Sequence, residues 1–328
     1  MSVERVAAVD CGTNSLRLLV ADVDTATGTL TDVERTMRIV RLGQGVDATG
    51  AFAPEALART FAAVDEAAAA CRRHGVAPGA VRFVATSASR DVSNRDEFVA
   101  GVRARLGVEP EVIPGAEEAR LSFTGATREL RGSSPAGFLV VDLGGGSTEF
   151  VLGEGEPEAA LSVDVGSVRL TERHLRSDPP TAAEVAAARA DVTAALAAVG
   201  RRVPLERTRT LVGVAGTITT VTAAALDLTA YVPGTLHGAR LPVDAVRAAC
   251  DRLLGASRAE RAAMPFVHPG RVDVIGAGAL VWRTVLDHLA EVAGVGEVVT
   301  SEHDILDGTA FSAAERTTAR TPAGPEGL

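Results

Sequence analysis

The sequence predicts an α/β protein made of two duplicated halves, and a repeated strand–turn–strand unit is the main observation behind this prediction. The segments VAAVDCGTNSLRLLVADV (6–23) and LVVDLGGGSTEFVLGEG (139–155) each contain an apolar strand that ends in Asp, a turn rich in Gly and Ser, and a second strand. Strand and helix patterns then follow each copy. The copies align at an offset of 132 positions, which pairs Asp10 with Asp142, Gly12 with Gly144 and Ser15 with Ser147. A repeat of this kind indicates an internal duplication.

The first half reads in the order βββαβα. Residues 35–50 suit a short third strand followed by a Gly-rich loop, and the Ala-rich residues 54–74 have helical spacing. Residues 81–85 form a strand pattern, and the hydroxyl residues Thr86 and Ser87 are placed to cap the helix that follows. A second strand–loop–helix pattern covers EVIPGAEEARLSF, with two glutamates in the first helical turn.

The second half repeats this order. We expect LSVDVGSVRLTE (161–172) to be its third strand and residues 181–199 to be a long helix. Strand-to-helix patterns follow in the segments 210–226 and 297–311, and between them the segment 271–294 suits a helix entered from a loop. The polar stretch 131–137 is rich in residues that break regular structure, so we place the boundary there. The expected division is a first domain over 1–132, a second over 133–316 and a disordered tail over 317–328.

Composition excludes several classes of function. The net charge is −9 and every basic residue is arginine, since the chain contains no lysine. A Walker A loop and Schiff-base chemistry both need a lysine, so both are excluded. The acidic balance argues against binding of a nucleic acid polymer. Three cysteines without CxxC spacing indicate neither a disulfide framework nor a thiolate metal site.

Hydropathy predicts a protein that does not cross a membrane. No stretch approaches the roughly 20 apolar residues of a membrane span, and residues 1–9 lack the pattern of a signal peptide. We therefore expect a cytoplasmic location.

The two turns are candidate phosphate sites. Glycines let the backbone approach a ligand closely, and successive N–H groups beside a hydroxyl bind phosphate oxygens. The alternative is that the turns serve only to reverse the chain. The candidate phosphate-binding residues are Gly12, Thr13, Asn14 and Ser15 in the first turn and Gly144, Gly145, Gly146 and Ser147 in the second.

Three acidic residues on or beside these turns are candidate metal ligands. Asp142 ends an apolar strand, where an unpaired carboxylate is costly, and Asp10 and Glu149 lie on the same units. Carboxylate oxygens beside a phosphate site suit Mg²⁺, with Mn²⁺ as an alternative. A strand-end Asp that only accepts N–H bonds from its own turn is the competing interpretation.

Further candidates lie at other strand-to-helix turns. Glu117 and Glu118 open a helix, where acids complement the helix dipole, but one of them could instead act as a general base toward water. The guanidinium groups of Arg90 and Arg271 match phosphoryl oxygens, although surface ion pairs are the more common explanation for such arginines. Ser87 and Gly216 complete the set of candidate phosphate-binding residues.

Eight motifs in order resemble the family of exopolyphosphatases and guanosine pentaphosphate phosphohydrolases (Ppx/GppA). They cover about residues 6–311 and are DCGTNSLRLL, ATSASRDVSN, IPGAEEARLSF, VVDLGGGSTEF, VGSVRLTE, VGVAGTITT, HPGRVDVIGAGAL and SEHDILDG. The resemblance implies two duplicated ribonuclease-H-like domains, the superfold of actin, chaperone ATPases and sugar kinases, with a cleft between them. It also implies release of terminal phosphate from polyphosphate, from guanosine pentaphosphate (pppGpp), or from both, with magnesium and water.

The same resemblance implies roles for individual residues. Glu118, the second glutamate of its motif, corresponds to the catalytic base of the family, and Asp142 and Glu149 correspond to the acids implicated with the metal. Long family members continue into helical C-terminal domains that this sequence does not contain, which favours a short substrate or pppGpp. The short form is most similar to actinobacterial members, and the family suggests a homodimer.

Two other functions remain open at this point. An ATP-dependent kinase or ATPase of the same superfold would leave phosphate on an acceptor or require ATP. A binding module would hold polyphosphate or pppGpp without turnover.

Overall fold

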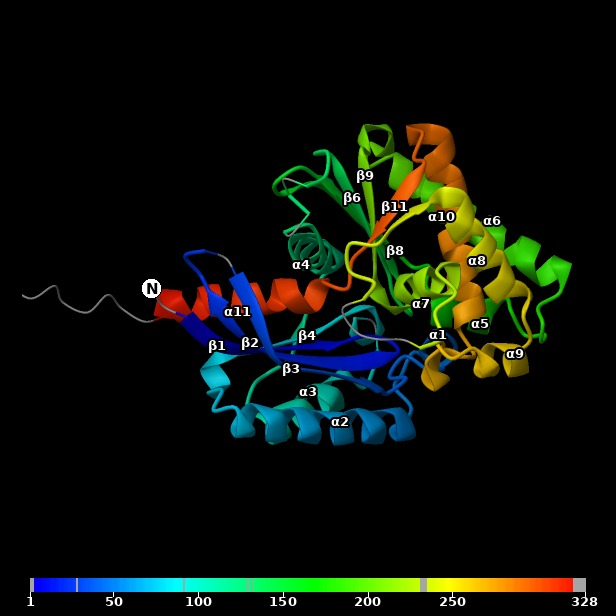
Figure 1. Cartoon of the computed structure of the whole chain (residues 1–328). Coiled ribbons are helices and arrows are strands. Elements are labelled where there is room, and N and C mark those ends of the chain that lie inside the picture. The colour runs from blue at the N-terminus through cyan, green and yellow to red at the C-terminus, as the bar shows by residue number, and fades with distance from the viewer. Residues whose placement is uncertain are drawn as a thin grey trace, which may run out of the picture.

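The computed structural model describes residues 3–27, 29–90, 92–128, 130–131, 133–230 and 235–320. It contains two α/β lobes, each built around one mixed sheet (Figure 1). The predicted duplicated α/β fold is therefore confirmed. Within these described residues, no helix is both long enough and apolar enough to pass through a membrane.

The first sheet has the strand order β3-β2-β1-β4-β5. The hairpin of β1 and β2 and the pairing of β2 with β3 are antiparallel, whereas β1–β4 and β4–β5 are parallel. The strands are β1 (Val3–Cys11), β2 (Ser15–Asp24), β3 (Thr29–Ile39), β4 (Val81–Ala85) and β5 (Glu111–Val112).

The second sheet repeats this topology with one added strand, in the order β10-β11-β9-β6-β7-β8. Here β6–β7 and β7–β8 are antiparallel, and β6–β9 and β9–β11 are parallel. Both lobes thus have the strand pattern of the ribonuclease-H-like fold. The strands are β6 (Phe138–Leu143), β7 (Thr148–Gly153), β8 (Pro157–Val163), β9 (Thr210–Val214), β10 (Arg240–Pro242) and β11 (Glu297–Thr300).

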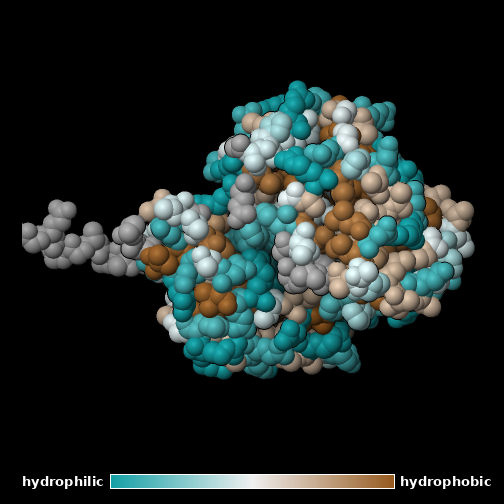
Figure 2. All heavy atoms as spheres, in the orientation of Figure 1, coloured by the Kyte–Doolittle hydropathy of each residue, from teal (hydrophilic) through white to brown (hydrophobic). Residues whose placement is uncertain are grey.

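The helices pack against the sheets through their apolar faces. In α2 (Pro54–Arg73) a proline occupies the first turn, and the buried Ala, Leu and Val residues recur at helical spacing. Its outer side, at the bottom of the view, is predominantly hydrophilic (Figure 2). The other helices of the first half are α1 (Val46–Thr49), α3 (Arg95–Leu106) and α4 (Gly115–Thr127).

The second half contains longer helices. Thr181 and Glu184 form a reciprocal capping box that starts α6 (Ala182–Gly200), and Ser257 and Glu260 do the same for α9 (Arg258–Ala263). The remaining helices are α5 (Ser167–Arg173), α7 (Ala215–Ala225), α8 (Val243–Gly255), α10 (Ile275–Ala293) and α11 (Ile305–Arg320).

Two local predictions are wrong. Thr86 and Ser87 do not cap the next α-helix, because residues 87–89 form one 3-10 turn and α3 begins later, after Asn94. The segment 161–172 is a strand only to Val163; its second part forms α5, whose first N–H groups bond to the turn after β6. In both segments, hydrogen bonds between the backbone and other parts of the chain determine where strand or helix begins and ends.

Two helices cross between the lobes. α4 follows the first sheet but packs against β6, β7 and β8, whereas α11 follows the second sheet and packs against β1 and β2. They meet at glycines: a Cβ added to Gly125 would lie 1.9 Å from the carbonyl oxygen of Asp304, and one added to Gly308 would lie 2.0 Å from that of Leu121. Only glycine allows these two backbones to approach so closely.

The expected division into domains stays a prediction. The last strand of the first sheet, β5, precedes the expected boundary, and the first strand of the second sheet, β6, follows it. However, α4 packs against the second sheet and α11 against the first. Gly132, at that boundary, lies outside the described residues. Helix α11 continues to Arg320, four residues into the segment expected to be a tail, and residues 321–328 lie outside the described part.

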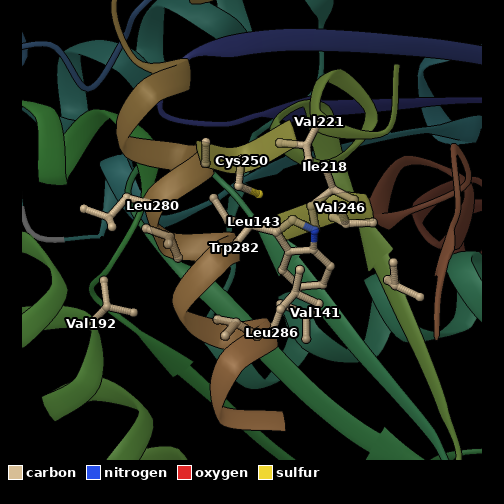
Figure 3. Close-up of a cluster of buried hydrophobic side chains, with 14 of the residues drawn as sticks. Val141, Leu143, Val192, Ile218, Val221, Val246, Cys250, Leu280, Trp282 and Leu286 are labelled. Carbon is tan, nitrogen blue, oxygen red and sulfur yellow. The ribbon is translucent and has the colours of Figure 1, made fainter. Parts of the chain in front are cut away.

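The largest buried side chain is that of Trp282 on α10, in the core of the second lobe. It packs among Val141, Ile218, Cys250 and Leu286 (Figure 3). Its indole nitrogen has no hydrogen-bond partner among the residues that the structure describes, and the contacts of this side chain there are those of packing.

We expect Trp282→Ala to lower the free energy of unfolding by about 3–5 kcal/mol, because a large cavity would remain in a closely packed core. Val292→Ala on the same helix is the control: Val292 is 39% exposed, so its loss should be within about 0.5 kcal/mol. Urea unfolding followed by circular dichroism measures both. Equal losses in the two variants would contradict this account of the core.

Candidate active site

The two predicted turns face each other across a cleft between the lobes. The cleft is open to solvent and has a volume of about 750 Å³. It contains most of the predicted site residues, namely Asp10, Gly12, Thr13, Asn14, Ser15, Glu118, Asp142, Gly144, Gly145, Ser147, Gly216 and Arg271. The topology therefore brings together residues that lie more than two hundred positions apart in the sequence.

An equivalent backbone hydrogen bond closes each of the two turns. The amide of Gly12 donates to the carbonyl of Ser15 at 2.9 Å, and the amide of Gly144 donates to that of Ser147 at 3.0 Å. The duplication noted in the sequence thus extends to the backbone geometry of the two turns.

Helix α5 sets the orientation of the second turn. The carbonyls of Gly144 and Gly145 accept hydrogen bonds from the amides of Ser167 and Val168, at 3.1 and 2.8 Å. In a planar trans peptide the following N–H group points opposite to the carbonyl. The N–H groups that follow these carbonyls, those of Gly145 and Gly146, are therefore directed away from α5.

The first turn is oriented in the same way by the segment after β3. The carbonyl of Thr13 accepts from the amide of Gly43 at 2.8 Å, and the carbonyl of Asn14 accepts from Val40 and Arg41 at 3.0 and 2.9 Å. By the same reasoning, the amides that follow, those of Asn14 and Ser15, point away from this segment. Two such turns that line one cleft can form an anion-binding cradle.

Three buried carboxylates lie beside this cradle. Asp142 and Glu149 are direct cross-strand partners on β6 and β7, and Glu118 is in the first turn of α4. Ser122 donates to Asp142 at 2.6 Å, and Ser162 donates to Glu149 at 2.6 Å. Glu149 is buried behind Asp142 and does not line the cleft itself.

The carboxylates repel one another. Burial and the carboxylate of Glu149 raise the pKa of Asp142 to about 8. Burial, and again Glu149, raise the pKa of Glu118 well above its usual range, and burial raises that of Glu149. Concentrated negative charge of this kind is stabilised by a cation or by protons.

Asp10 differs from its counterpart Asp142 because its cross-strand partner is Arg17 rather than an acid. Arg17 donates to Asp10 at 2.7 Å and also pairs with Asp304, at the start of α11. Burial still raises the pKa of Asp10. The carboxylate of Asp10 is thus already engaged by a guanidinium, whereas that of Asp142 faces another acid.

The structure separates the two adjacent glutamates of α4. Glu117 pairs with Arg82 at 3.0 Å and Arg120 at 2.9 Å, away from the cleft. Glu118 lines the cleft and pairs with Arg90, whose Nε also donates to the carbonyl of Ile113 at 3.1 Å. Arg90 therefore contacts the candidate base without lining the cleft wall.

Arg271 lies directly against Gly216 on the far side of the cleft. Its guanidinium donates to the carbonyl of Gly216 at 3.3 Å, and a Cβ at position 216 would lie 2.1 Å from its central carbon. The preceding Ala215 has a φ of 75°, in the left-handed region. Glycine is needed at 216 so that the guanidinium can lie across the start of α7.

Some predicted residues are placed elsewhere. Gly146 lies on the other side of the second turn, where its carbonyl accepts from Arg169 at 2.8 Å. The side chain of Ser87 lies outside the described part of the structure. Among the described residues, no three Asp, Glu, His or Cys side chains are arranged to hold a metal ion by themselves.

Sequence reasoning missed several residues of the cleft. Arg17 carried a usable signal, since it occupies the position of Glu149 in the repeat. Four others are chain neighbours of predicted residues, namely Thr86, Leu143, Ala215 and Thr217, whereas Ser167, Val274, Ile275 and Ile305 come from segments that approach the cleft only in the folded chain.

Comparisons with known proteins agree with this architecture. A model of the Ppx/GppA phosphatase family matches residues 19–312. The chain is 55% identical over 321 residues to exopolyphosphatase 2 of Mycobacterium tuberculosis, covering 96% of this chain and 100% of the relative. It is also 29% identical over 317 residues to the bifunctional 3-dehydroquinate synthase/phosphatase of Fusobacterium nucleatum, covering 94% of this chain and 46% of that protein.

Solved structures give the same result. An exopolyphosphatase-like protein superposes with a TM-score of 0.92 at 45% identity, covering 95% of this chain and 98% of the other. The PPX-GPPA enzyme of Aquifex aeolicus superposes with a TM-score of 0.77 at 29% identity, covering 95% and 100%. From its sequence and its fold alike, the chain belongs to the Ppx/GppA phosphatase family.

Proposed function

We propose that this protein is a phosphoanhydride hydrolase that releases terminal phosphate from inorganic polyphosphate. The observation that carries the proposal is the cleft, which both turns line together with the buried carboxylate of Glu118. The relatives named exopolyphosphatase support this choice of substrate.

In this proposal Glu118 is the general base. A water oxygen attacks the terminal phosphorus, its proton passes to the Glu118 carboxylate, and the anhydride P–O bond breaks to give inorganic phosphate and a shortened chain. The turns hold the terminal phosphate and stabilise the charge on its oxygens. Positioning and charge stabilisation supply most of the rate enhancement in phosphoryl transfer, so these parts suffice.

We further propose that Asp142, with Glu149 behind it, holds Mg²⁺ or Mn²⁺. The fit rests on their chemistry: two facing buried carboxylates with raised pKa values are oxygen donors in need of a cation. Mg²⁺ usually binds through one or two carboxylates, waters and substrate phosphates, so a complete protein cage is not required. When bound, the metal supplies positive charge beside the phosphate oxygens.

The compound pppGpp is a second candidate substrate, because it presents the same terminal phosphoanhydride to the turns. Phosphate release from short polyphosphate, long polyphosphate and pppGpp, each with and without magnesium, tests the proposal. Release from polyphosphate without any nucleotide supports the hydrolase and excludes an ATP-dependent kinase. Tight binding without release in the presence of magnesium would overturn the proposal in favour of a binding module.

We expect Glu118→Gln to lower kcat by at least about 10²-fold, because the amide cannot accept the proton of water. Glu117→Gln is the matched control, since it is the same change on the neighbouring residue, which pairs with Arg82 and Arg120 outside the cleft. Steady-state phosphate release measures both. Near wild-type turnover by Glu118→Gln would refute its role as base.

Removal of the metal with a chelator should abolish turnover, and added Mg²⁺ should restore it and raise the melting temperature by mass action. The double variant Asp142→Asn, Glu149→Gln should lose this thermal shift, because it lacks both charged donors. Asp22→Asn, in an ion pair with Arg5 at the edge of the first lobe, should keep it. An unchanged shift in the double variant would exclude these residues as the metal site.

A further inference from the structure

The tips of the two phosphate turns touch each other. A Cβ added to Gly145 would lie 3.1 Å from the Cβ of Thr13. The first turn belongs to the first sheet and the second turn to the other, so the separation of their N–H groups depends on how the lobes are held. Small misplacements of such donors are costly to catalysis.

A series of hydrogen bonds joins the turns behind the cleft. On the first side, Gly43 donates from its amide to the carbonyl of Thr13 at 2.8 Å, and its own carbonyl accepts from Val46, the residue before Asp47. On the second side, Arg169 donates through Nε to the carbonyl of Gly146 at 2.8 Å.

Asp47 connects the two sides of this series of hydrogen bonds. Its Oδ1 accepts from Arg169 at 2.6 Å, so one guanidinium contacts both Asp47 and the second turn. Its Oδ2 accepts from Nε of Arg173 at 2.7 Å. A parallel contact runs from the amide of Gly45 to Glu172 at 3.1 Å.

The Asp47–Arg169 ion pair is partly shielded from solvent and lies behind the turns. Asp47 and Arg169 have side chains that are only 22% and 20% exposed. Together with Thr13 and Gly146 they line a small second cavity on the side of the turns opposite the main cleft. The Asp47–Arg169 pair is therefore a partly buried contact between the lobes, placed directly behind both turns.

We propose that Asp47 is a positioning residue. Through Arg169 it fixes the peptide that follows Gly146 and, through the segment 43–47, it ties that peptide to the first turn. It touches neither the cleft nor the candidate base, so its effect on catalysis is indirect. The kinetic part of this inference rests on the proposed function, whereas the structural part does not.

The test compares Asp47→Asn, Asp47→Glu and the control Asp22→Asn. Asp22, like Asp47, accepts through both carboxylate oxygens, but both of its bonds, at 2.7 and 2.8 Å, come from the single arginine Arg5 within one sheet. Hydrogen–deuterium exchange without substrate is the first measurement. We expect Asp47→Asn, and not Asp22→Asn, to exchange faster in the peptides that cover 40–50 and 144–147, at an unchanged melting temperature.

Phosphate release from tripolyphosphate is the second measurement. Loss of a partly buried ion pair should lower kcat/KM about fivefold to tenfold, mainly through KM, and Asp47→Glu should recover most of it. High salt should narrow the gap between wild type and Asp47→Asn.

The two measurements separate the possible failures. If exchange and kcat/KM in Asp47→Asn match those in Asp22→Asn, the positioning role is refuted. If exchange rises locally but the wild type releases no phosphate from any of the tested compounds, the proposed hydrolase is wrong and the structural role of Asp47 stands.

Discussion

The contact between two glycine-containing turns, one from each lobe, is the constraint on which the rest of the site depends. Thr13 and Gly145 meet at the tips, and the backbone carbonyls of both turns are bonded on the side away from the cleft. Those bonds leave the following N–H groups directed to the opposite side. A phosphate held by both turns, as we propose, would contact both lobes, and its binding would be linked to their relative position.

The duplication is symmetric in its backbone and asymmetric in its charge. At equivalent positions the first hairpin carries Arg17 and the second carries Glu149. The first half thus neutralises its strand-end aspartate internally, while the second accumulates negative charge that a cation or protons can stabilise. One half supplies a guanidinium to the cleft and the other supplies candidate metal ligands, so the two halves have complementary chemistry on a common scaffold.

The crossed helices α4 and α11 explain how the remaining groups reach the cleft. Their close approach places Gly125 of α4 against Asp304, which pairs with Arg17, and places Leu121, about one turn after Glu118, against Gly308. Arg82 and Arg120 engage Glu117 on the outer side. The rotation of α4, and hence which glutamate faces the cleft, follows from these contacts.

The sequence by itself determined the duplicated α/β fold, the two turns and the carboxylates beside them. Strand periodicity and turn glycines are local signals, and the internal repeat presents the same signals in both halves of the chain. It could not determine the start of α3, the change from strand to helix after Val163, or the engagement of Asp10 by Arg17. The tertiary structure decided these, and also joined Asp47 to Arg169. Apart from the Asp10–Arg17 pair, which lies within one hairpin, such contacts link residues far apart in the chain.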